Sequence, residues 1–213
     1  MTKTFVSYHH GNDQQYKEAL VSWAANAGLI TDLSVGVGDI EESNDHQGIR
    51  RRIRDNYLRD SEVTILLCGI HTRFRKHVDW EIKSSMINGS VNSQSGILVI
   101  DLPTSRSNTW ITQYPAEKDI VYPEYSGTWG PIGGSGELKE QFPDLPRRIL
   151  ENLVKPEVSI SIVPWNRVYG YADRLQYLLE QTAKSGRTNR YDLGRPMRMK
   201  NFNPAYDAYD VRT

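Results

Sequence analysis

One carboxylate lies beside the apolar face of an expected helix over residues 73–88. The apolar side chains of this segment recur at helical spacing, and their stripe consists of Phe74, Val78, Ile82 and Met86. Glu81 is only about 20° from Phe74 on a wheel that advances about 100° per residue, and His77 is beside it. A carboxylate next to a buried stripe costs free energy unless it has a partner or a use. Two interpretations stay open: Glu81 reaches solvent or pairs with an arginine, or it carries chemistry.

Other polar residues follow the expected strands of a sheet. In an open parallel sheet, ligands bind outside the carboxyl ends of the strands, where the direction of the crossovers switches. This rule selects the segments 8–13, 36–42 and 68–74, and the residues from Asp101 onwards. A ligand is therefore expected at that edge of the sheet.

Two further signals for chemistry are incomplete. The glycines of segment 36–38 follow a strand, but position 41 is Glu, so the sequence lacks the GxGxxG dinucleotide fingerprint. His9, His10 and Asp13 could contact a metal. No HExxH motif or paired Cys/His spacing accompanies them, and we expect no metal site.

Basic residues gather in two places. The arginines of segment 50–54 could grip a phosphate or nucleic acid, although acidic residues follow them and such a run is more often the solvated face of a helix. The tail from Lys184 is also basic and contains Phe202, Tyr206 and Tyr209. It could bind nucleic acid by stacking, or act as an arm for self-association that gives a homo-oligomer.

The elements that must position these residues alternate along the first half of the chain. Strands are expected at residues 4–8, 29–35, 63–68 and 97–101. The helices between them are expected from Asn12 or Asp13 (as the cap) to Gly28, around residues 49–57, and at 73–88. This alternation predicts right-handed crossovers and a parallel sheet with helices on both faces.

The second half of the chain is less regular. Pro, Gly, Ser and aromatic residues dominate an insertion at about 102–157, in which we expect one short helix at 146–154. A last strand at 158–163 and a helix at 165–182 follow. We therefore predict one α/β domain over residues 1–183 and a C-terminal tail over 184–213.

Composition excludes several classes of protein. The 213 residues suffice for one well-buried core, and the 26 basic residues balance the 26 acidic ones. Because of this balance, nucleic acid is an unlikely partner. No apolar stretch approaches the roughly 18 residues needed to span a bilayer, so we expect no membrane association. The single cysteine, Cys68, is typical of a buried apolar side chain, and its isolation fits a reducing, cytoplasmic location.

Two segments resemble the TIR-like family. The opening Phe5-Val6-Ser7-Tyr8 resembles the first-strand box of TIR domains, and His9 follows it as in the small TIR subunit of Thoeris antiphage systems. The segment 72–82, Thr-Arg-Phe-Arg-Lys-His-Val-Asp-Trp-Glu-Ile, is similar to the helix that carries the catalytic glutamate of TIR enzymes. The resemblance covers residues 3–101 well and 119–182 loosely. It implies a flavodoxin-like, TIR-like sheet with an elaborated C-terminal half.

The resemblance also implies an activity. It implies that NAD is a substrate, not a cofactor, and that the nicotinamide–ribose bond is cleaved to give a cyclic ADP-ribose isomer. This product would be the messenger to a separate effector protein in antiviral defence. Glu81 takes the position of the catalytic glutamate, where a carboxylate can stabilise oxocarbenium-like charge on the ribose.

Six further residues are implied as substrate-binding. Tyr8 and His9 would line the pocket and stack on a ring, and Asp39 matches the loop that covers the ligand in TIR domains. The remaining three positions are Ser7, Phe74 and His77. Many relatives have Trp at the position of His77, four residues before the glutamate, whereas this chain has Trp80. This difference predicts weaker or rearranged stacking on nicotinamide.

Two other interpretations remain open. A non-catalytic TIR-type module would assemble through the loop at 36–47 and would not need Glu81. A receiver-like domain could use a similar sheet, but only Asp13 closely follows the first strand, and no acidic cluster with a lysine accompanies it.

Overall fold

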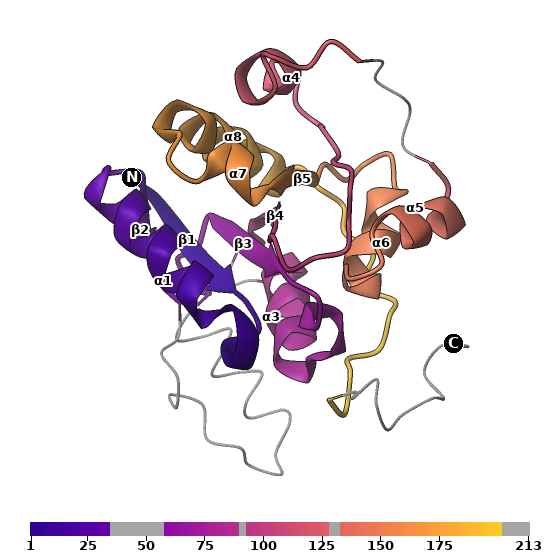
Figure 1. Ribbon diagram of the computed structural model, residues 1–213. Coiled ribbons are helices and arrows are strands. Elements are labelled where there is room, and N and C mark those ends of the chain that lie inside the picture. The colour runs from indigo at the N-terminus through magenta and orange to yellow at the C-terminus, as the bar shows by residue number, and fades with distance from the viewer. Residues whose placement is uncertain (35–57, 90–92, 128–132, 202–213) are drawn as a thin grey trace.

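The protein has a five-stranded, all-parallel sheet in the order β2-β1-β3-β4-β5. The computed structural model describes residues 1–34, 58–89, 93–127 and 133–201 (Figure 1). The strands are β1 (Thr2–Ser7), β2 (Ile30–Asp32), β3 (Val63–Cys68), β4 (Gly96–Asp101) and β5 (Ser161–Pro164). The chain continues from β1 to β2 on one side and later to β3 on the other. The crossover direction therefore switches between β1 and β3.

Helices cover both faces of the sheet. Their bounds are α1 (His10–Asn26), α3 (Lys76–Met86), α4 (Glu117–Val121), α5 (Ser135–Gln141), α6 (Arg147–Leu153), α7 (Trp165–Val168) and α8 (Ala172–Gly186), and a 3₁₀ turn, η2 (Thr72–Phe74), precedes α3. Within the described residues, no helix has the length and apolar character needed to cross a bilayer.

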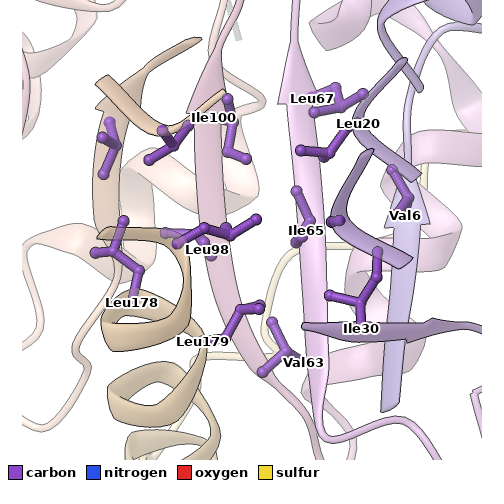
Figure 2. Close-up of a cluster of buried hydrophobic side chains, with 14 of the residues drawn as sticks. Val6, Leu20, Ile30, Val63, Ile65, Leu67, Leu98, Ile100, Leu178 and Leu179 are labelled. Carbon is purple, nitrogen blue, oxygen red and sulfur yellow. The ribbon is translucent and has the colours of Figure 1, made fainter. Parts of the chain in front are cut away.

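Alternate residues of the central strands supply two separate cores. Ile65 and Leu67 of β3 face α1 and α8, in the cluster that Figure 2 shows. Leu66 and Cys68 face the other way, in the cluster that contains side chains of α3 and α6. All six residues of β3 are buried, as expected for a strand covered on both faces. The predicted parallel α/β fold is confirmed.

The expected helix at 73–88 was wrong at its N-terminus. Phe74 belongs to η2, and Arg75 is extended, with φ −96° and ψ 122°, before α3 begins. Phe74 is thus not on the same helix as Val78, Ile82 and Met86, which do lie in one core cluster. The apolar periodicity continues through the break, so spacing alone could not reveal it.

Other boundaries also differ from those expected. The first helix begins at His10, so Asn12 and Asp13 lie inside it and neither caps it. The expected helix at 165–182 is two helices, because Gly170 adopts φ +87° between them. The expected last strand is shifted to Ser161–Pro164, and the insertion holds α4 and α5 as well as the predicted α6. The helix expected at 49–57 lies outside the described residues.

The described part of the C-terminal tail packs along α3 and α6 (Figure 1). The indole Nε1 of Trp80 donates to the carbonyl of Arg198 at 2.7 Å, and the side-chain amide of Asn201 accepts from the backbone of Lys76 at 2.9 Å. Helix α8 runs to Gly186, past the expected boundary at 183/184. The tail thus forms part of the surface over α3.

A buried ion pair joins α3 to α6 beneath this tail. Both oxygens of Asp79 accept hydrogen bonds from Arg148, at 3.0 and 3.1 Å, and the backbone N–H of Arg198 donates to Asp79 Oδ2 at 2.8 Å. Arg148 is only 1% exposed. Removing one partner of such a pair leaves the other charge buried without a counter-charge.

We expect Asp79→Ala to lower the free energy of unfolding by about 3–5 kcal/mol, because it leaves the Arg148 guanidinium buried without its carboxylate. Glu151→Ala is the control, since Glu151 pairs with Arg195 at a partly exposed position and such pairs contribute at most about 1 kcal/mol. Urea unfolding measures both. Equal losses in the two variants would show that the Asp79 pair does not anchor the helix.

Candidate active site at the switch between β1 and β3

Glu81 lies at the edge of the sheet where the crossover direction switches. Its helix, α3, follows β3, and its carboxyl oxygen Oε2 accepts a hydrogen bond of 2.6 Å from the hydroxyl of Ser7, the last residue of β1. These residues are 74 positions apart in the sequence. The contact therefore exists only because β1 and β3 are neighbours in the sheet.

The carboxyl group of Glu81 is buried, with 4% of the residue exposed. Burial raises its pKa from 4.5 to about 8, and the hydrogen bond from Ser7 offsets part of that rise. Glu81 is therefore mostly protonated at pH 7 in the unliganded protein. The interpretation in which it reaches solvent at the edge of the stripe does not fit this position.

A hydrogen bond attaches helix α3 to strand β3 one turn after Glu81. The hydroxyl of Ser85 donates to the backbone carbonyl of Glu81 at 2.8 Å and shares a 2.7 Å hydrogen bond with the hydroxyl of Thr64 on β3. Val78 and Ile82 anchor the same helix in the apolar core. These contacts fix the height and the rotation of α3, and with them the direction of the Glu81 side chain.

Tyr8 lies on the opposite face of β1 from Ser7. Its ring is buried in the core cluster under α1, stacks on His10 at 4.4 Å, and its hydroxyl donates to Gln14 at 2.6 Å. Burial and, next, the charge of Glu81 raise the pKa of Tyr8 to about 12. One face of the ring is already occupied, and stacking on a ligand stays a prediction.

His9 connects β1 to α1 and faces a group of cationic and imidazole side chains. Its Nδ1 is buried and has no hydrogen-bond partner within the described residues. Burial and, next, the charges of Arg75, His71 and His10 lower the pKa of His9 to about 4. His9 is therefore a neutral imidazole at physiological pH.

Two more histidines lie at this edge. The sequence analysis considered His10 only as a possible metal contact and gave no role to His71, although His71 lies in the segment after β3 that the strand-end rule selects. His77, one turn before Glu81 on α3, packs edge-on against Trp80 at 5.3 Å. Partial burial lowers the pKa of His10, and the nearby His77 and Lys17 add to this effect. The four imidazoles therefore come from the start of α1 (His9 and His10), the segment before η2 (His71) and α3 (His77), and they lie near one end of the sheet.

Phe74 is placed differently from the other predicted residues. It is 7% exposed, carries the guanidinium of Arg73 over its ring at 4.4 Å, and lines a cavity with Leu145 and Leu150. Glu81 does not line that cavity. Asp39, the remaining predicted residue, lies outside the described residues.

A second buried carboxyl lies beside the switch. Asp13, 1% exposed in α1, accepts a 3.3 Å hydrogen bond from Thr72, whose hydroxyl also accepts from the N–H of Gly69 at 2.8 Å. Burial raises the pKa of Asp13 to about 6, and the bond from Thr72 lowers it in part. Among the described residues, no three His, Cys, Asp or Glu side chains are grouped to hold a metal ion.

Replacing Glu81 tests the burial of this carboxyl. Its folded-state pKa lies above 4.5, so the protonated group stabilises the fold fully below about pH 4.5, and this contribution is lost as the pH rises towards 8. We expect Glu81→Gln to be more stable than the wild type by a margin that grows from pH 5 to about pH 8, at about 1.4 kcal/mol per pH unit at most, and that stays constant above it. Thermal unfolding across this range measures the margin.

The control is Glu180→Gln, which replaces an exposed glutamate on α8. Its difference from the wild type should stay constant over the same pH range. A constant difference for Glu81→Gln as well would mean that the carboxyl is solvated in the folded protein.

One comparison with known proteins finds a match. A family model described as "Thoeris protein ThsB, TIR-like domain" matches residues 5–107, a range that runs from within β1 to beyond β4 and contains both Ser7 and Glu81. No curated protein matches the chain. This match covers 103 of the 213 residues, and over that range the chain, with its parallel α/β sheet, is similar to the TIR-like domain of the Thoeris protein ThsB.

Proposed function

We propose that the protein is an enzyme that consumes NAD as a substrate, with Glu81 as its catalytic carboxyl. The supporting observation is the position of that carboxyl: it is buried at the β1/β3 switch, held by Ser7, and has a pKa raised to about 8. Perturbed carboxyl groups at such a switch are characteristic of functional sites. The similarity of residues 5–107 to the Thoeris TIR-like domain supports the same reaction class.

The reaction breaks the bond between the nicotinamide nitrogen and C1′ of the ribose. Nicotinamide leaves as a neutral molecule with the bonding electron pair, and positive charge develops on the ribose ring. An ionised Glu81 beside C1′ stabilises that charge and orients the ribose hydroxyls. A nucleophile of the same ADP-ribose unit then attacks C1′ and loses its proton to solvent, which gives a cyclic ADP-ribose isomer. Attack by water gives ADP-ribose.

Several neighbours of Glu81 assist in this proposal. Ser7 holds the carboxyl in one orientation and favours its ionised form. His9, neutral and with an unused Nδ1, offers a hydrogen bond to the substrate without repelling the cationic nicotinamide ring. His77 takes the place at which many relatives have Trp, and we assign it, with Tyr8, to the wall of the ring pocket. Phe74 and Asp39 remain proposed substrate contacts.

The product would act as a messenger. We propose that it is released in the cytoplasm and recognised by a separate effector protein of the defence system. Self-association of the chain into a homo-oligomer would be a second layer of control. The messenger role follows from the resemblance to the Thoeris family and depends first on turnover of NAD, whereas self-association is inferred from the basic tail.

Turnover can be measured directly as nicotinamide release from NAD by the purified protein. We expect Glu81→Gln to lower the rate at least 100-fold, because the amide cannot carry the charge that opposes the ribosyl cation. Glu117→Gln is the matched control. Glu117 is also a buried glutamate that accepts a serine hydroxyl, from Ser161 at 2.7 Å, but it lies in α4 and not in the site.

Mass spectrometry of the products separates a cyclic isomer from linear ADP-ribose. If wild type and Glu81→Gln release nicotinamide at the same rate while both remain folded, the enzyme assignment fails. Oligomerisation that depends on concentration, without NAD turnover, would then favour the non-catalytic interaction module.

The pH dependence of turnover should follow the raised pKa. Because the ionised carboxylate is the active form, kcat/KM should increase with pH up to about 8 and level off above it. The hydrogen bond from Ser7 lowers the pKa of Glu81, so Ser7→Ala should move this rise to higher pH and reduce the rate at pH 7. Rates measured from pH 6 to 9.5, corrected for spontaneous NAD decay, test both expectations. A profile that falls over this range would contradict the assignment of Glu81 as the ionised group.

A further inference from the structure

A basic cavity lies between the start of α3, the start of α6 and the C-terminal segment 195–201. Its volume is about 530 Å³, within the usual range for small-molecule sites. Of the fourteen described residues that line it, seven are Arg or Lys and only Asp79 is acidic. The whole chain has equal numbers of basic and acidic residues. Positive charge is therefore concentrated here, and we name this feature the arginine cavity.

The single acidic lining residue does not neutralise that charge. Both oxygens of Asp79 are engaged by Arg148, and one also accepts the N–H of Arg198. Arg195 is paired with Glu151 through two hydrogen bonds to its carboxylate. Arg73 and Arg75 also line the cavity, and the carboxylates of Asp79 and Glu151 pair with other arginines.

Arg73 and Arg75 each have a buried Nε–H without a hydrogen-bond partner in the described part of the chain. A buried donor left without an acceptor costs free energy, and the cost is larger for a charged group. Burial lowers the pKa of Arg73, and the nearby Arg106, Arg147 and Arg198 lower it further, although Asp144 opposes them. A guanidinium nevertheless stays charged in proteins. An anion held by the guanidinium groups of Arg73 and Arg75 would relieve the repulsion among the cations that line the cavity.

The shape and remaining lining favour a phosphorylated small molecule. Phosphate oxygens match the fork of a guanidinium group, which can donate two parallel hydrogen bonds. Pro146, Pro196 and Met197 provide apolar surface beside the arginines, against which a flat ring can pack. A long nucleic acid is less suited, because the chain as a whole carries no net positive charge to attract an extended polyanion.

We propose that the arginine cavity binds a phosphorylated small molecule of nucleotide size, with its phosphate on Arg73 and Arg75. The cavity borders the Glu81 site, since the charge of Arg75 reaches His9, yet Glu81, Ser7 and His9 do not line it. Binding here does not require NAD turnover. The proposal therefore stands or falls independently of the proposed reaction.

The test is titration calorimetry of the full chain with ADP and with inorganic pyrophosphate at low salt. We expect the double variant Arg73→Gln/Arg75→Gln to bind ADP at least 10-fold more weakly, and Arg73→Lys/Arg75→Lys to recover part of the loss. Arg187→Gln removes a guanidinium that is 77% exposed at its side chain and should bind as the wild type does. Glu81→Gln should also retain binding, which separates this site from the catalytic one.

Further variants keep the proposal falsifiable. Lys200 lines the cavity and is exposed, so Lys200→Glu should fold normally and weaken ADP binding at least 3-fold, even if the double arginine variant is unstable. Circular dichroism and thermal unfolding establish folding for each variant. Undetectable ADP and pyrophosphate binding at millimolar concentration, unchanged affinity in the folded variants, or tighter binding of a 20-nucleotide single strand than of ADP would each overturn the proposal.

Discussion

The buried hydrogen bond between Ser7 and Glu81 is the contact on which the site depends. It holds an acid at the switch between β1 and β3, in surroundings that keep the group protonated at neutral pH. Burying a carboxyl disfavours its charged form, and a fold keeps such a group where the energetic cost has a use. The same burial that destabilises the ionised protein would strengthen the interaction of the carboxylate with a positively charged sugar, because the local dielectric is low.

Helix α3 is held from two sides to make this contact possible. Glu81 and Ser85 face β1 and β3, whereas Asp79 faces α6 and the C-terminal segment through Arg148 and Arg198. The family match ends at residue 107, so Arg148 and Arg198, which hold α3 through Asp79, lie beyond the matched range. The elaborated C-terminal half therefore supports the candidate site, and it also supplies most of the wall of the arginine cavity. The candidate catalytic site at the sheet edge and the proposed anion site beside it share one helix, α3.

Local patterns were sufficient for the central elements and insufficient at their ends. The continuous apolar runs of β3 and β4 and the spacing of Val78, Ile82 and Met86 gave the correct elements, because each pattern reflects burial on a fixed face. The breaks at Arg75 and Gly170 were missed. Apolar periodicity extends across both, so spacing alone does not reveal where the backbone leaves the helical conformation.

By itself, the sequence determined the α/β class, the apolar stripe of α3 and the presence of Glu81 beside it, because neighbours in sequence and helical spacing decide these features. Only the tertiary structure decided that Glu81 meets Ser7 from 74 residues away, that Tyr8 turns into the core, and that Phe74 faces α6. The arginine cavity likewise draws on segments near residues 73, 147 and 198. The physical reason is that strand order and helix packing bring distant segments together, and no local periodicity encodes which charges will then face one another.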